Sequence, residues 1–102
     1  MIIMEYCSKG DLAKEISTRR LTKRYFKESE IWSMWMHIVL SLHELNKNSK
    51  NKVIHRGITP DNILIDERNT LKLGDFGHAK ILGNENSFVM TTMKASKYLS
   101  PE

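Results

Sequence analysis

Residues 55–77 read HRGITPDNILIDERNTLKLGDFG, and this stretch decides the fold expected for the chain. Two short apolar runs, ILID and TLKLG, flank the polar residues ERN, a pattern that predicts an antiparallel hairpin. Asn69 lies in the predicted turn, and asparagine tolerates the left-handed backbone conformation that such turns often need. The hairpin would therefore join a polar loop that contains Pro60 to the loop DFG.

Before this stretch, apolar residues recur at steps of three and four between residues 30 and 45, which predicts a long helix. The stripe consists of Ile31, Trp35, Ile38, Val39, Leu42 and Leu45. Glu28 and Glu30 lie where negative charge suits the positive end of the helix dipole, and Ser29 is a candidate cap. Three further large side chains widen the apolar surface, and we interpret them as core: Trp32, Met34 and Met36.

The first third of the chain alternates between apolar and basic segments. Residues 1–5, MIIME, predict a short buried strand that ends before Gly10. Residues 11–16, DLAKEI, have an acidic start and good helix formers, and predict one or two helical turns. The basic residues 17–27 are expected to form a loop, as is the polar sequence after Gly77.

Composition sets the size and class of the molecule. A chain of 102 residues with 40% hydrophobic and 27% charged residues fits at most one small globular domain. A chain of this size buries only about two-thirds of its unfolded surface, so the core is modest. The net charge of +4 comes from two basic groups, residues 19–27 and 47–52. We interpret both as solvated surface rather than a nucleic-acid site, because no aromatic platform or nucleic-acid motif accompanies them.

The single cysteine, Cys7, cannot form an internal disulfide, so an oxidising compartment is not indicated. No run approaches the roughly 20 apolar residues that cross a bilayer. The opening MIIMEYC is too short and lacks the basic leader of a signal peptide. The chain is therefore expected to be intracellular and cytoplasmic, without a membrane partner.

The order of the polar motifs is more specific than any one of them. HRGITPDN, a hairpin, DFG and then SPE at residues 100–102 follow the protein-kinase order of catalytic loop, metal-binding loop and end of the activation segment. The chain resembles the middle of a eukaryotic protein kinase, and MEYCSKGDL, KLGDFGHAKIL and KYLSPE are most similar to the NIMA-related serine/threonine kinases. The resemblance implies an α+β, partial kinase-like fold over residues 1–102: a hinge strand and the first half of a mainly helical C-lobe with a small β-hairpin.

The resemblance also implies where ATP would bind. Met4 would be the gatekeeper behind adenine, and the main chain from Glu5 to Cys7 would be the hinge. Asp11 would lie near the ribose, and Leu64 would form the floor under adenine.

Two residues would hold Mg²⁺, namely Asn62 and Asp75, and magnesium prefers such hard oxygen ligands together with phosphate oxygens. His55 would be a structural residue under the loop. Arg56 would pair with an activation-segment phosphate, for which two threonines are candidates: Thr91 and Thr92. The remaining histidines show no metal-site spacing.

Three positions depart from the family pattern. Gly57 stands where kinases have the aspartate that accepts the substrate proton, and Thr59 stands where they have a lysine that steadies the phosphate. Ala95 replaces the activation-segment threonine that bonds to both. Two nearby carboxylates could in principle substitute, but we interpret Asp61 and Asp66 as solvated acids. The catalytic set is therefore degenerate.

General-base assistance contributes about 10² to 10⁴ in rate, so losing it alone leaves room for slow turnover. The leading interpretation is a catalytically impaired pseudokinase with residual ATP and Mg²⁺ binding. One alternative is an active serine/threonine kinase that transfers the γ-phosphate of ATP to protein, and another is a truncated gene product without a stable fold. Residues 1–102 hold no glycine-rich phosphate loop and no strand lysine for the phosphates, and the expectation is a domain without its N-lobe and later C-lobe helices. A protein is the expected partner or substrate, with a cytoskeletal location implied by resemblance only, and no oligomeric state is indicated.

Overall fold

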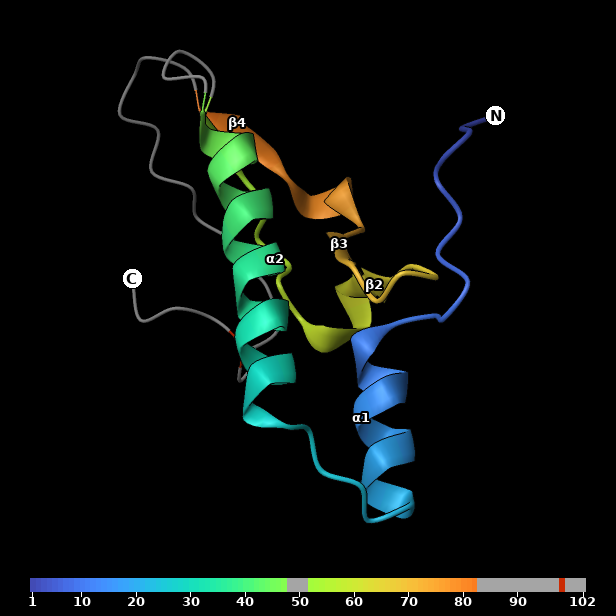
Figure 1. Cartoon of the computed structure of the whole chain (residues 1–102). Coiled ribbons are helices and arrows are strands. Elements are labelled where there is room, and N and C mark those ends of the chain that lie inside the picture. Colours follow the sequence, from blue (N-terminus) through green and yellow to red (C-terminus); the bar gives the residue numbers. More distant parts are fainter. Residues whose placement is uncertain (48–51, 83–97, 99–102) are drawn as a thin grey trace.

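The computed structural model describes residues 1–47, 52–82 and 98. Its elements are α1 (Leu12–Leu21), α2 (Glu28–Asn46), β1 (Lys52–Ile54), η1 (Pro60–Asn62), β2 (Ile63–Ile65), β3 (Leu71–Leu73), η2 (Phe76–His78) and β4 (Lys80–Leu82). Figure 1 shows the two helices joined by a connection at one end, with the β2–β3 hairpin close to the start of α1. Two helices and two small antiparallel sheets in the described part confirm the predicted α+β class.

Helix α1 begins at its cap, Asp11, whose carboxylate accepts the main-chain N–H three residues on at 2.7 Å. The predicted helix is confirmed, but it continues to Leu21, so the loop predicted for 17–27 is wrong over its first part. An ion pair one turn apart supports this extension, since Arg19 Nε donates to Glu15 Oε1 at 2.7 Å. Basic character alone does not prevent a helix, because arginine and lysine are good helix formers.

Helix α2 confirms the long helix predicted from the apolar stripe. Its cap is Lys27 rather than Ser29, so the predicted cap is wrong. The Glu30 carboxylate reaches back and accepts the main-chain N–H of Lys27 at 2.7 Å. A glutamate at the third helical position satisfies a donor of the first turn in this way, whatever side chain the cap residue has.

The hairpin is confirmed: β2 pairs antiparallel with β3, with Ile63 opposite Leu73 and Ile65 opposite Leu71. Asn69 has φ 63, the left-handed conformation expected for it. Ile63, Ile65 and Leu71 are buried, and Leu73 packs against them. A shift of one residue would move these side chains to the other face, so their burial fixes the register of the pair.

Asp66, expected to be a solvated acid, instead organises the hairpin turn. Its Oδ1 accepts the main-chain N–H groups of Arg68 at 2.9 Å and Thr70 at 2.8 Å. The bond from Thr70 is the main reason that the pKa of the Asp66 carboxyl lies below its ordinary value. The side chain is only 14% exposed. The interpretation was wrong because aspartate bonds readily to the backbone two residues on in turns.

A second two-stranded sheet, which was not predicted from the sequence, joins the two ends of the segment that contains the polar loops. β1 pairs antiparallel with β4, and Ile54 lies opposite Lys80. The residues after Gly77 were expected to form a loop, and a strand of three residues is too short to show a period of two. This pairing holds the loop after β1 beside the loop before β4.

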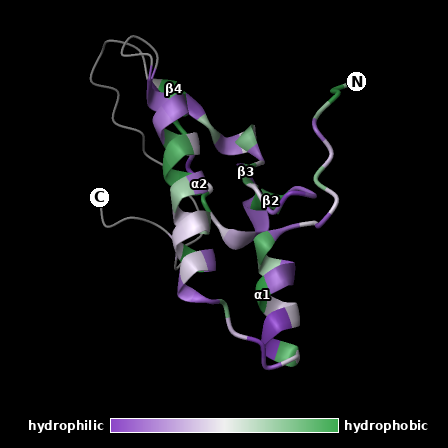
Figure 2. Ribbon diagram, viewed as in Figure 1, coloured by the Kyte–Doolittle hydropathy of each residue, from purple (hydrophilic) through white to green (hydrophobic). Residues whose placement is uncertain are grey.

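The core is small and lies where α1, α2 and the hairpin meet. Its buried hydrophobic residues are Leu12, Ile63, Ile65 and Leu71, against which Phe26, Met34, Ile38 and Leu73 pack. Figure 2 shows these elements with mixed polar and apolar faces rather than an apolar interior on all sides. Because Met34 packs against these buried residues, the prediction that it belongs to the core is confirmed.

The strand predicted for residues 1–5 is wrong. These residues have no regular structure, and Met4 is 80% exposed. A strand needs a neighbour to pair with, and neither sheet of the described residues includes this segment. The apolar run alone therefore does not make a hinge strand in this structure, and Figure 1 shows it leading away from the hairpin.

The core prediction is also wrong for Trp32 and Met36, which are 60% and 49% exposed. Trp35, in the predicted stripe, is 58% exposed. In the described part, α2 contacts β1, β3 and, through the ion pair of Glu30 with Arg19, α1, and these contacts leave both tryptophans largely exposed. Neither described helix combines the length and apolar character that a membrane crossing requires.

Candidate functional site

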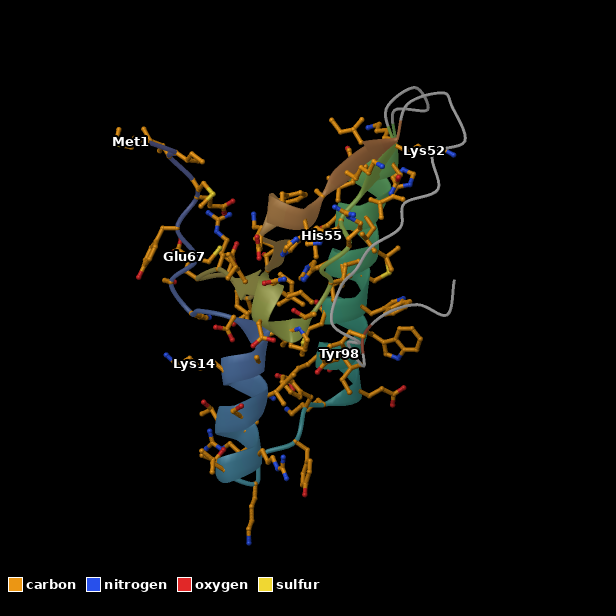
Figure 3. The ribbon with its side chains drawn as sticks, turned by 180° about the vertical axis from the view of Figure 1, so that it is seen from behind. Met1, Lys14, Lys52, His55, Glu67 and Tyr98 are labelled. Atoms are coloured by element: carbon orange, nitrogen blue, oxygen red, sulfur yellow. The ribbon has the colours of Figure 1, made fainter. Side chains whose placement is uncertain are left out.

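His55 is the centre of the polar loops and is only 2% exposed. Its Nε2 lies 2.9 Å from the carbonyl oxygen of Gly74, and its Nδ1 accepts the main-chain N–H of Gly57 at 3.2 Å. A carbonyl can only accept, so Nε2 donates and the imidazole is the neutral Nε2–H tautomer. The ring also packs on Phe76, with centroids 4.8 Å apart. Its burial and its two ring hydrogen bonds confirm the predicted structural role, and Figure 3 shows where His55 lies in the chain.

Gly57 and Asn62 are brought together in the loop after β1. The Asn62 side-chain amide donates to the carbonyl oxygen of Gly57 at 2.9 Å. A Cβ added at position 57 would meet that amide nitrogen at 3.3 Å. The residue that replaces the expected aspartate therefore lies directly beside a predicted magnesium ligand.

Asp75 lies next to the same loop through one main-chain bond. The N–H of Gly74, the residue before it, donates to the carbonyl oxygen of Asn62 at 2.8 Å. Asp75 has φ 55, and its Oδ1 accepts the N–H of Gly77 at 3.2 Å. A non-glycine residue at positive φ is uncommon and is held there by its surroundings. The two predicted magnesium ligands thus lie on adjoining loops.

The second left-handed residue at this site is Arg56, with φ 62. Its Nε donates to the carbonyl oxygen of His78, so the arginine joins the catalytic-loop segment to the residues after DFG. Both threonines predicted to carry its phosphate partner, Thr91 and Thr92, and the degenerate position Ala95 lie outside the described residues.

The residue expected to replace the phosphate-steadying lysine, Thr59, precedes the turn η1. Its carbonyl oxygen accepts the N–H of Asn62 at 3.0 Å, and its side chain makes no capping bond. The neighbouring Asp61 is exposed, as expected for a solvated acid. Neither side chain offers the fixed cation that a lysine would bring to this loop.

The predicted nucleotide residues fall into two groups. Asp11 and Leu64 are partners in an isolated antiparallel bridge, and Cys7 is half-buried a few residues before Asp11. The Asp11 carboxylate also caps α1, so it already has a structural partner. Met4, the predicted gatekeeper, is mostly exposed.

Glu5 is held by a residue that the sequence did not point to. Lys72 on β3 lies 3.1 Å from the Glu5 carboxylate, and this contact is the main reason that the pKa of the lysine is raised. Leu64 is the register partner of Lys72, so both side chains lie on one face of the hairpin. Strand alternation could have placed Lys72 on this face, but nothing in the sequence indicated its partner.

The donor chemistry of Asn62 and Asp75 fits magnesium. The Asn62 amide nitrogen is bonded to Gly57, which leaves its Oδ1 as the free acceptor, and Asp75 supplies a carboxylate. Mg²⁺ is typically bound by one or two such groups plus phosphate oxygens and water. No group of three or more His, Cys, Asp or Glu side chains that could hold a metal alone occurs in the described part. The pair therefore suits a phosphate-bound ion rather than an all-protein site.

Comparisons with known proteins agree with this geometry. Residues 1–102 match the family described as Protein kinase domain. The chain is 42% identical over 101 residues to "Probable serine/threonine-protein kinase nek2" of Dictyostelium discoideum, covering 99% of this chain and 24% of that protein. It is 38% identical over 103 residues to "Serine/threonine-protein kinase Nek2" of Mus musculus, covering 99% and 23%. A third relative, "G2-specific protein kinase fin1" of Schizosaccharomyces pombe, is 34% identical over 117 residues, covering 99% and 16%.

The chain spans about a quarter or less of the length of these relatives. The match to the kinase family nevertheless covers every residue of the chain. The chain therefore belongs to the protein kinase family and, within it, to the NIMA-related kinases.

Proposed function

We propose that this chain is part of a pseudokinase domain. It keeps residues that bind Mg²⁺-ATP weakly and has lost the residues that transfer the phosphate. Protein is the proposed partner class, because the relatives are named as protein kinases. Their activity is proposed for this chain only as far as its own residues support it.

The observation that carries the proposal is the position of Gly57 beside Asn62. The amide of Asn62 is bonded to the Gly57 carbonyl, so the loop keeps its frame at the position that lacks a side chain. A glycine can neither orient a substrate hydroxyl nor accept its proton. Loss of general-base assistance typically lowers the rate by about 10² to 10⁴.

A second loss adds to the first, because Thr59 carries no charge. Phosphoryl transfer depends chiefly on positioning and on stabilising charge at the transferred phosphate. A threonine hydroxyl cannot replace the electrostatic contribution of a lysine ammonium. The two substitutions act on the same transition state, which supports inactivity more strongly than either does alone.

The chain retains both predicted magnesium ligands, which supports weak nucleotide binding. Asn62 Oδ1 and the Asp75 carboxylate would hold the ion, which when bound neutralises charge on the ATP phosphates. Asp75 is fixed at positive φ by its bond from Gly77, and His55 fixes the loop on its other side. These residues orient the two oxygen donors before any ligand arrives.

Equilibrium binding of a fluorescent ATP analogue, with and without Mg²⁺, tests this proposal. We expect weak binding that requires Mg²⁺ and is lost in Asp75→Asn. Asp61→Asn is the matched control, because Asp61 is an exposed carboxylate of the same loop, and it should bind as the unaltered chain does. Binding that is equal without Mg²⁺, or that survives Asp75→Asn, would exclude the proposed metal role.

An active kinase is the second candidate function, and one observation favours it. Both Asn62 and Asp75 are retained and lie on adjoining, hydrogen-bonded loops. An enzyme without its base can still turn over slowly when positioning is preserved. Phosphate transfer, rather than nucleotide binding, separates the two candidates.

A further inference from the structure

A cavity of about 360 Å³ lies between α1, α2 and the hairpin. Its apolar wall includes Leu12, Phe26, Met34 and Leu71. None of the proposed nucleotide or metal residues lines it, so it is separate from the site described above. Its volume falls in the range of about 300 to 1,000 Å³ that is typical of ligand pockets.

The two acidic side chains of this cavity share one arginine, and Lys9, which also lines the cavity, supplies the second positive charge. Glu15 and Glu30 both bond to Arg19, at 2.7 and 2.8 Å. The guanidinium also lies over the Phe26 ring, 4.0 Å from its centroid. The cavity therefore presents an apolar wall and a closed ion-pair network rather than open carboxylates.

The connection between the helices is strongly basic and lies next to this cavity. Arg19 and Phe26, which bracket the connection, both line the cavity. Between them lie three exposed cations that form no ion pair with a described residue: Arg20, Lys23 and Arg24. We call these three residues the basic turn, and residues 16–27 contain no acidic residue.

The backbone of the basic turn is fixed, and it carries apolar side chains as well. The N–H of Arg24 donates to the carbonyl oxygen of Arg19 at 2.9 Å, and Lys23 has φ 53. Leu21 and Tyr25 are 85% and 89% exposed. Figure 1 shows this connection at the end where the two helices are joined, at the opposite end of α1 from the hairpin. Cations carried on a fixed backbone beside exposed apolar groups suit a partner that has both negative charge and an apolar side chain.

We propose that the cavity and the basic turn form a docking site for an acidic peptide segment of a partner protein. One apolar side chain of the segment enters the cavity, and its neighbouring carboxylates face Arg20, Lys23 and Arg24. Charge complementarity selects an acidic partner, and the apolar wall selects a peptide over a polyanion without apolar side chains. This inference does not depend on nucleotide binding.

The test is fluorescence anisotropy without nucleotide, using a labelled peptide with one leucine between two runs of glutamate. The same peptide with serine in place of leucine should bind about tenfold more weakly, because it cannot bury the apolar side chain. The double variant Arg20→Glu/Arg24→Glu should weaken binding of the leucine peptide by about tenfold or more and reduce its salt dependence.

A matched control separates a local site from overall charge. Lys47→Glu/Lys52→Glu makes the same change in net charge on exposed residues away from the cavity, and it should change affinity by less than about twofold. Ser33→Trp, which fills the cavity from α2, should remove the preference for leucine over serine. Circular dichroism checks that each variant keeps its helices.

Three results would overturn the docking site. These are equal affinity for the leucine and serine peptides, equal weakening by both charge reversals, and tighter binding of a single-stranded RNA oligonucleotide that Arg20→Glu/Arg24→Glu removes. The comparison of the two peptides on the unaltered chain decides even if a variant fails to fold. Failure here would leave the nucleotide proposal untouched.

Discussion

His55 fixes the catalytic-loop frame through both of its ring nitrogens. It joins Gly57 on one side to Gly74 on the other. Gly57 is the position of the missing aspartate, and Gly74 directly precedes the predicted magnesium ligand Asp75. The frame is therefore maintained by main-chain groups, which place no requirement on the side chain at position 57. This explains how glycine can stand in place of aspartate at position 57 while the loop keeps its conformation.

Replacing His55 with alanine should leave the Gly57 N–H and the Gly74 carbonyl without their partner. Each buried polar group left unbonded costs about 1 to 3 kcal/mol. We expect faster amide hydrogen exchange at Gly57, measured by NMR. His43→Ala, which removes an exposed histidine from α2, should leave that rate unchanged. Equal exchange at Gly57 in both variants would show that the imidazole does not hold the loop.

Glu30 should make stability depend on acid pH. Its bond from Arg19, followed by that from the Lys27 N–H, lowers the pKa of the carboxyl from 4.5 to about 2. A carboxylate with a lowered pKa stabilises the folded chain above its unfolded pKa and loses this effect as pH falls. The stabilisation should therefore disappear between pH 4.5 and about 2.

Urea unfolding of the chain and of Glu30→Gln across this window measures the effect. Asp66 titrates in the same direction, so the difference between the two proteins isolates Glu30. The unaltered chain should be the more stable near neutral pH, and the two should converge as pH approaches 2. A constant difference at all pH values would argue against the Arg19 pair as its source.

At the scale of elements, periodicity predicted α2 and not its environment. The steps of three and four marked one apolar stripe, but they did not show which residues have neighbours. The contacts of α2 in the described part leave Trp32 and Trp35 largely exposed. Apolar residues at helical spacing predict that a helix face is buried, but the spacing does not identify the element that buries it.

Exposure of these tryptophans is directly measurable. We expect acrylamide to quench the fluorescence of the chain nearly as strongly before unfolding in urea as after it, because Trp32 and Trp35 are 60% and 58% exposed. Both tryptophans of the chain contribute, so the signal reports on α2 alone. Strong protection before unfolding would show that this side of α2 is covered.

The hairpin was predictable because its information is local. Apolar runs, a polar turn and Asn69 at positive φ all lie within residues 63–74. The pairing of β1 with β4 joins residues nearly thirty positions apart, and strands of three residues carry too little pattern to announce it. The sequence therefore predicted the local hairpin, but it did not predict the pairing of strands that lie far apart in the chain.

At the scale of the whole molecule, the order of the motifs predicted more than any single residue did. The kinase family and the α+β class followed from the order of HRGITPDN, hairpin and DFG, and both are confirmed. The expected strand at residues 1–5 failed because a strand depends on a sheet that its own sequence does not contain. The site residues Asn62 and Asp75 are brought onto adjoining loops, while their ligand remains a prediction.

Transfer of phosphate from ATP to a protein substrate decides between a pseudokinase and a slow kinase. With radiolabelled ATP and Mg²⁺, we expect the purified chain to label a general protein substrate no more than Asp75→Ala does. Loss of the base and of the lysine charge at Gly57 and Thr59 is the physical reason. Clear ATP-dependent labelling that disappears in Asp75→Ala would contradict the proposal and establish an active kinase.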